Sequence, residues 1–134
     1  MEGRAPISAA QFIAASARRS DLYESIRGLL ADVDVIALPT AQLFPFDAEL
    51  TWPREVAGRT MDTYHRWMEV SILATLINAP AIALPAGLGA AGLPIGVQLI
   101  GRNHDERGLL SAARTWQDVQ PAVPLPALLE YLGD

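Results

Sequence analysis

The side chains in this sequence that have the chemistry for catalysis or metal binding are its serines, histidines and carboxylates. Cysteine and lysine are absent, and all ten basic residues are arginine. Thiolate nucleophiles, disulfides, zinc–thiolate sites, Schiff bases and lysine general bases are therefore excluded for this chain by itself. A nucleophilic serine sits on a strained turn beside a base, whereas the six serines here fall within predicted helices or at their caps, so we expect no catalytic residue among them. They are Ser8, Ser16, Ser20, Ser25, Ser71 and Ser111.

The two histidines have acidic neighbours. His65 and Glu69 are four residues apart and on a helix would face the same side, but a zinc site needs a third ligand, so a polar, partly exposed face is favoured. His104 stands beside Asp105 at the predicted start of a helix. There it either orients a bound anion or belongs to the helix cap, and the cap is favoured. The sequence thus predicts no metal site and no cofactor.

Two short motifs resemble functional sites but have simpler explanations. Asp32–Asp34 resembles half of a metal motif, and a turn between a helix and a strand explains it better. The run Gly87–Gly92 contains a literal G-x-G-x-x-G. A dinucleotide fingerprint must open a helix directly after a strand, whereas here Leu93-Pro94 and another strand follow. We therefore expect a hairpin-type turn at this run.

Composition and charge limit the possible partners. The net charge is −5, and the arginines are scattered along the chain. Phosphate backbones are bound by clustered positive surfaces, so we expect no nucleic-acid partner. No stretch approaches eighteen uncharged apolar residues, and the N-terminus lacks the order of a signal peptide, so we expect no membrane partner and a cytoplasmic location. With 134 residues, 51% of them hydrophobic, residues 1–134 are expected to form a single domain.

The first half of the chain predicts a helix, a strand and a long loop. Ser8 and Gln11 form a capping box, with Ile7 and Phe12 placed as a hydrophobic staple, and the helix is expected to end near Asp32. Apolar residues recur along it at helical spacing. These are Phe12, Ala15, Leu22, Tyr23, Ile26, Leu29 and Leu30. A buried strand with both faces covered is expected over 34–40, followed by a long ordered loop at about 41–59. Loops of this length in compact domains are usually functional or packed against another element.

The second half predicts a helix over 60–77, strands over 80–85 and 95–100, and a helix opened by a capping box of Asn103 and Glu106. A short helix is expected over 127–132. The alternation of helices with very apolar strands indicates an α/β protein with a partial mixed β-sheet flanked by helices. The strands at 81–84 and 95–100 are close enough in the chain to be antiparallel neighbours. A three-stranded sheet leaves open edges, so we expect self-association or another partner to cover them.

Three blocks of sequence, in fixed order, carry a resemblance to a known enzyme family. Asp34–Thr40 reads D-x-x-x-x-P-T, and Trp52–Met68 is similar to one bacterial branch of that family. Pro80–Leu110 contains P-A-x-x-x-P-x-G, then G-L-P-x-G-x-Q-x-x-G, then D-x-x-x-L-L. Over about Ile7–Gln117, the chain resembles the C-terminal part of the amidase signature family. One departure is Asn78, where many members have glycine, at a position expected to shape a turn.

The resemblance implies an α/β/α fold and hydrolysis of carboxamides by a serine nucleophile. In that family a second serine, on a cis peptide, links the nucleophile to a lysine base, and a glycine- and serine-rich stretch supplies oxyanion donors. Those elements lie upstream of the blocks seen here, so none of the family's catalytic residues can be placed in this sequence. The resemblance leaves sheet strands, outer helices and one wall of a substrate pocket. The candidate residues for that wall, against the alternative of ordinary packing under the loop, are Thr40, Gln42, Phe44, Trp52, Tyr64 and Trp67.

Three hypotheses of different classes follow. In the first, the chain is the C-terminal part of a carboxamide hydrolase. It is not catalytically competent alone and needs an N-terminal amidase half. A small-molecule amide is the substrate of the complete enzyme only. In the second, it is a stand-alone interaction or small-molecule-binding module derived from an amidase. In the third, it is a remnant that folds without a function.

Overall fold

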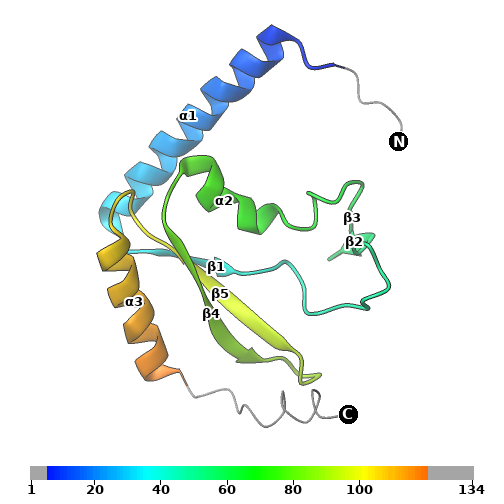
Figure 1. Ribbon diagram of the computed structural model, residues 1–134, viewed down its shortest axis with the longest axis vertical. Coiled ribbons are helices and arrows are strands. Elements are labelled where there is room, and N and C mark those ends of the chain that lie inside the picture. Colours follow the sequence, from blue (N-terminus) through cyan, green and yellow to red (C-terminus); the bar gives the residue numbers. More distant parts are fainter. Residues whose placement is uncertain (1–5, 121–134) are drawn as a thin grey trace.

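A three-stranded antiparallel sheet forms the centre of the structure, a computed structural model that describes residues 6–120. Two helices cover one side of the sheet and a third covers the other (Figure 1). The elements in chain order are α1 (Ala9–Asp32), β1 (Ile36–Pro39), β2 (Glu55–Val56), β3 (Arg59–Thr60), α2 (Glu69–Ile77), β4 (Ala81–Leu88), β5 (Pro94–Ile100) and α3 (Glu106–Val119). The strand order is β1-β5-β4, and β2 pairs with β3 in a separate small hairpin. The expected α/β class with helices flanking a partial sheet is confirmed.

The first helix begins as predicted, but only its C-terminal part is packed. Ser8 is the N-cap, and the capping box with Gln11 is formed in both directions, at 3.2 and 2.9 Å. The N-terminal half projects away from the sheet (Figure 1), and Ile7 and Phe12 are 76% and 68% exposed. The predicted staple therefore buries little surface. Of the predicted apolar stripe, the residues from Leu22 onward supply the contacts with the body of the protein.

The sheet buries two separate apolar clusters, one on each face. β5 lies in the middle and pairs antiparallel with both neighbours, which confirms the expected pairing of β4 and β5. On one face, Ile100 of β5 packs with Ile36 of β1, with residues of α2, and with the Leu22–Ile26 part of α1. On the other face, Leu99 packs with Leu84 of β4 and with Leu109 of α3. Because side chains alternate along a strand, consecutive residues of β5 serve the two clusters.

The expectation that the first strand has both faces covered is wrong. β1 alternates between half-buried and exposed side chains, with Ala37 and Pro39 exposed. The reason is the position of α3. Ala37 and Pro39 share a sheet face with Leu99 and Val97, but the helix that covers this face, α3, lies against β4 and β5 and leaves β1 uncovered. Within residues 6–120, β1 and β4 are the outer strands of the sheet.

The predicted helix over 60–77 is too long at its start. Met61 is buried, and its backbone is used by the preceding segment: its N–H donates to the Arg54 carbonyl at 2.8 Å, and its carbonyl accepts from Trp52 Nε1 at 3.1 Å. These bonds extend the β2–β3 hairpin, so the chain passes through turns before α2 begins at Glu69. The predicted loop at 41–59 is correspondingly not wholly irregular, since it contains β2.

The predicted capping box of Asn103 and Glu106 is also wrong. Asp105 caps α3, and its side chain accepts from the Gly108 N–H at 3.0 Å. Asn103 instead donates Nδ2 to the carbonyls of Ile77 and Asn78, at 3.3 and 2.7 Å, at the end of α2. Asn78 itself ends α2 in the left-handed conformation (φ +54°), which asparagine tolerates better than most residues, so its expected role in a turn is confirmed.

Two further points concern the helix expected near the C-terminus and the possibility of a membrane-spanning helix. The helix predicted over 127–132 lies outside the described residues. Over 6–120, no helix combines the length and hydropathy needed to cross a bilayer.

Candidate functional site

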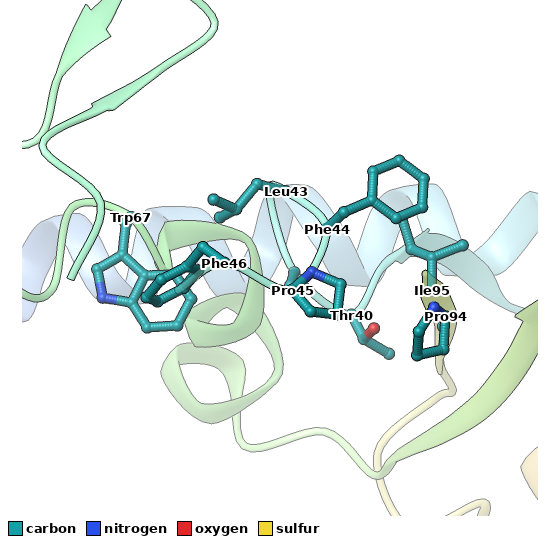
Figure 2. Close-up of a pocket in the computed structure, with 10 residues that line it drawn as sticks. Thr40, Leu43, Phe44, Pro45, Phe46, Trp67, Pro94 and Ile95 are labelled. Atoms are coloured by element: carbon teal, nitrogen blue, oxygen red, sulfur yellow. The ribbon is translucent and has the colours of Figure 1, made fainter. Parts of the chain in front are cut away.

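An open apolar cleft lies where the segment after β1 runs beside the start of β5. Its volume is about 420 Å³, within the range of small-molecule sites. Figure 2 shows the side chains that surround it. They come from the end of β1 and the following loop, from the turn before α2, and from the first residues of β5: Thr40, Ala41, Leu43, Phe44, Pro45, Phe46, Trp67, Pro94, Ile95 and Gly96.

Two glycines of the β4–β5 hairpin make room for cleft residues. A Cβ at Gly89 would lie 2.6 Å from the ring of Phe44, so the ring rests directly on the glycine backbone. A Cβ at Gly96 would lie 2.8 Å from Thr40 Oγ1. The Thr40 N–H donates to the Gly96 carbonyl at 3.0 Å, which continues the β1–β5 pairing into the cleft. The hairpin-type turn expected at Gly87–Gly92 is confirmed, and within it Gly89 lies against the cleft residue Phe44.

An aromatic chain extends from the cleft toward the small hairpin. Phe46 and Trp67 are edge-to-face at 5.5 Å between ring centroids, Trp67 and Tyr64 at 5.8 Å, and Tyr64 and Trp52 at 6.3 Å. Such pairs stabilise beyond their area burial by about 0.5–1.5 kcal/mol each. The guanidinium carbon of Arg54 lies 4.0 Å from the Trp52 ring centroid, a cation–π contact. The aromatic chain therefore fixes Trp67 as one wall of the cleft.

The Trp67 nitrogen is the exception among the three tryptophans. Trp52 Nε1 donates to the Met61 carbonyl and Trp116 Nε1 to the Pro85 carbonyl, both at 3.1 Å. Trp67 Nε1 is buried and has no hydrogen-bond partner in the described part of the chain. Figure 2 shows this nitrogen directed away from the other labelled side chains, with the six-membered ring on their side. The part of Trp67 that faces the cleft is therefore its six-membered carbon ring.

The six predicted wall residues have three different placements. Thr40, Phe44 and Trp67 line the cleft, whereas Trp52 and Tyr64 support it through the aromatic chain. Gln42 does not line it. Its Oε1 accepts from the Val70 N–H at 3.2 Å, which satisfies a free amide of the first turn of α2.

A second glutamine holds the other side of Val70. Gln98 is buried in β5, and its Nε2 donates to the carbonyls of Val70 and Pro39, both at 2.9 Å. Gln42 and Gln98 together attach the start of α2 to the sheet at the point where Trp67 enters the cleft wall. Gln98 belongs to the G-L-P-x-G-x-Q motif, and these two hydrogen bonds give a physical reason for an amide side chain there.

Replacing Gln98 with leucine is expected to lower the free energy of unfolding by about 1–3 kcal/mol. The change removes the side-chain donor that both carbonyls share, and the Val70 and Pro39 carbonyls lose this partner in a partly buried setting. Urea unfolding followed by tryptophan fluorescence measures the difference. Gln117→Leu, at an exposed position of α3, is the matched control and should change stability by less than about 0.5 kcal/mol. Equal effects of the two substitutions would contradict the role given to Gln98.

Six side chains of the wall, that of Ala41 among them, are absent from the set predicted from the sequence. Leu43 directly precedes Phe44, and Pro45 and Phe46 directly follow it; the proline-aromatic composition of this loop was their signal. Pro94 and Ile95 are contributed by β5. No local signal marks them, because their place depends on the pairing of β5 with β1.

Surface charges near the aromatic chain are paired with one another. Arg66 Nε donates to Asp62 Oδ1 at 3.1 Å, and its Nη1 donates to Glu69 Oε1 at 3.3 Å. The hydrogen bond and the charge of Arg66 lower the pKa of the Asp62 carboxyl, and its bond to Asp62 raises the pKa of the Arg66 guanidinium. Because folding lowers the pKa of Asp62, the ionised carboxylate stabilises the folded state at pH values above its unfolded pKa. This stabilisation is lost as the pH falls through the folded pKa. The groups are exposed, so the contribution is small.

Three of the serines form hydrogen bonds with nearby backbone carbonyls, and neither histidine lines the cleft. Ser20, Ser25 and Ser71 donate their hydroxyls to backbone carbonyls at 3.3, 2.9 and 2.8 Å. His65 lies before α2 and packs edge-to-face on Tyr64. His104 directly precedes the N-cap of α3 in the left-handed region (φ +61°). Within residues 6–120, no three histidine or carboxylate side chains gather where they could hold a metal ion.

Over residues 6–120, these features define an α/β protein with an open-edged antiparallel sheet and an apolar cleft where the segment after β1 lies beside the start of β5. The chain belongs to the Amidase family, whose profile matches residues 1–110. It is 34% identical to a fatty acid amide hydrolase of Arabidopsis thaliana over 125 residues, which are 90% of this chain and 20% of that protein. It is 32% identical to a glutamyl-tRNA(Gln) amidotransferase subunit of Parvibaculum lavamentivorans over 106 residues, 78% of this chain and 20% of that protein.

Solved structures agree with this assignment. The corresponding glutamyl-tRNA(Gln) amidotransferase subunit from Thermotoga maritima superposes with a TM-score of 0.69 at 28% identity, over 87% of this chain and 25% of that one. A bacterial aryl acylamidase of the amidase signature family gives 0.68 at 26% identity, over 78% and 22%. The resemblance to amidase signature enzymes is therefore confirmed. The chain spans about a fifth to a quarter of the length of these relatives.

Proposed function

We propose that this chain acts as the C-terminal part of an amidase-signature carboxamide hydrolase and supplies one wall of the substrate pocket. The observation that carries the proposal is the cleft: residues of the family motifs, Thr40 and Gly96, meet there by a backbone hydrogen bond. The sheet and helices hold this wall, and the two clusters share β5, which supports treating the described residues 6–120 as one unit.

In this proposal the catalytic groups come from outside the sequence. Lysine is absent, and arginine remains protonated at neutral pH, so it does not replace a lysine base. Three of the serine hydroxyls, those of Ser20, Ser25 and Ser71, donate to nearby backbone carbonyls. We therefore expect no carboxamide hydrolysis by the pure chain, and serine-dependent hydrolysis by it would contradict the proposal.

A chimera tests the proposal. Residues 1–120 of this chain replace the matching segment of a full-length amidase-signature relative, and ammonia release from a small carboxamide is measured. We expect the chimera to exceed a host truncated before the segment by at least about 100-fold, because the wall contributes to holding substrate in a reactive geometry. A folded, soluble chimera with no more activity than the truncated host would contradict the proposal; circular dichroism and gel filtration establish folding.

Within residues 6–120, β1 and β4 each leave one edge unpaired. Such edges pair readily with other strands, so in this proposal they need a partner. The first candidate is the N-terminal part of an amidase-signature chain. The second is another copy of this chain, and a strictly monomeric sedimentation profile at high micromolar concentration would exclude it.

A stand-alone binding module derived from an amidase is the second candidate function. It is favoured by the fact that the cleft is lined within a single stretch of this chain, residues 40–96. Ligand binding by the pure chain together with an inactive chimera would support the module over the hydrolase.

A further inference from the structure

Within the function proposed above, the cleft also specifies the chemical class of the substrate. We propose that it accepts the uncharged aromatic or branched aliphatic group of a carboxamide, and that Phe44 is the side chain that determines this selectivity. Which amides are bound is a separate property from how they are hydrolysed, and the two can be measured apart.

The chemical character of the lining is the first argument. The residues of 6–120 that line the cleft include no ionisable side chain. Trp67 directs its nitrogen away from the other labelled side chains (Figure 2), which leaves the Thr40 hydroxyl as the side-chain hydrogen-bonding group at this surface. A charged group that leaves water for such a surface loses hydration without gaining a partner. Charged amides are therefore disfavoured, and uncharged apolar ones are favoured.

Size and shape give the second argument. An apolar cavity of about 150 Å³ is enough to bind benzene, and this cleft is 420 Å³ and open on one side. It has room for a ring or a branched chain together with the amide. Phe44 and Phe46 are 42% and 36% exposed, so both rings remain available for contact with a ligand.

The support beneath Phe44 gives the third argument. Its ring rests on Gly89, where even a Cβ would lie at 2.6 Å. The ring is thus positioned by close approach to backbone, and it belongs to neither of the two buried clusters. A substitution at 44 consequently changes the chemistry of the cleft while the core stays intact, which is what a specificity-determining position requires.

Binding by the pure chain tests the inference independently of catalysis. Benzamide and 4-carbamoylbenzoate differ by one carboxylate, and their titration is followed by ¹H–¹⁵N NMR at the three tryptophan indoles. The Trp67 signal is assigned with Trp67→Phe. The indoles of Trp52 and Trp116, both hydrogen-bonded elsewhere, are internal references. We expect benzamide to shift the Trp67 signal more than both references and to bind at least about tenfold more tightly than the carboxylate.

Substitution at Phe44 sharpens the test. Phe44→Arg is expected to weaken benzamide binding and strengthen 4-carbamoylbenzoate binding, so that the preference falls by at least about tenfold. Phe12→Arg is the matched control, because Phe12 is an exposed phenylalanine on the projecting part of α1, and it should leave both affinities unchanged. Equal affinities for the two ligands, no shift at Trp67, or an unchanged preference in Phe44→Arg would overturn the inference.

The same ligand pair separates this inference from the proposed function. A chimera that hydrolyses both amides with equal kcat/KM would overturn the inference while the hydrolase proposal stands. Selective binding by the pure chain with an inactive, folded chimera would support the ligand class and contradict the hydrolase.

Discussion

Replacing Leu109 with alanine is expected to lower the free energy of unfolding by about 2–5 kcal/mol. Leu109 is 4% exposed and joins α3 to Leu99 and Leu84 of the sheet. Truncation removes its apolar contacts and leaves a cavity that the strands fill only in part. Because stability is marginal in most domains, such a loss would be visible as a large fall in the urea midpoint.

The adjacent residue provides the control. Leu110 has the same side chain on the same helix but is 59% exposed, so Leu110→Ala should change the free energy of unfolding by less than about 0.5 kcal/mol. Similar losses for both substitutions would show that α3 does not pack on the sheet through the face that carries Leu109.

Alanine at two different glycines is expected to have effects of opposite sign. At Gly96, an added Cβ would lie 2.8–2.9 Å from the Thr40 side chain and 3.0 Å from the Leu84 carbonyl, so the strands must shift at a cost of about 1–3 kcal/mol. At Gly28, in the exposed part of α1, nothing lies within 4 Å of such a Cβ. There, alanine should stabilise by about 0.5–1 kcal/mol, because glycine is the poorer helix former.

Thermal unfolding of the two variants beside the parent chain measures these differences. A Gly96→Ala variant as stable as the parent would mean that Thr40 does not rest on the glycine, and the geometry of the cleft would then be wrong. A destabilising Gly28→Ala would contradict the exposed position of that residue.

The elements predicted correctly from the sequence are those with local signals. Ser8 and Gln11 are three residues apart, so the capping box that starts α1 depends on its own sequence alone. The G-x-G-x-x-G run, which is followed directly by Leu93-Pro94, identified the hairpin. The short connection made β4 and β5 antiparallel neighbours. In each case the interacting groups are close in the chain.

The predictions that failed involve groups far apart in the chain. Asn103 was assigned to a local cap, but its acceptors are the carbonyls at the end of α2, 25 and 26 residues away. The start of α2 was placed too early because helical spacing does not reveal that the Met61 backbone is bonded to Arg54 and Trp52. Tertiary hydrogen bonds decided both outcomes over local preference.

The cleft residues show the same difference between local signals and contacts that are distant in the chain. Of the six wall residues expected from the family resemblance, Thr40, Phe44 and Trp67 line the cleft, and their contact with a substrate stays a prediction. Pro94 and Ile95 were missed because they reach the cleft only when β5 pairs with β1, a contact that sequence periodicity does not encode. The grouping of these residues is thus a product of the sheet register.

The central claim is that this chain supplies a structural wall to a carboxamide hydrolase whose catalytic groups lie in another segment. Its most direct test is the initial rate of ammonia release when the purified chain is added to the N-terminal segment of an amidase-signature relative, cut before the region that this chain matches. The account predicts no release by either component alone, and release from the mixture that rises with chain concentration to a plateau. Hydrolysis by the chain alone, or no release from a mixture whose components co-elute on gel filtration, would contradict it.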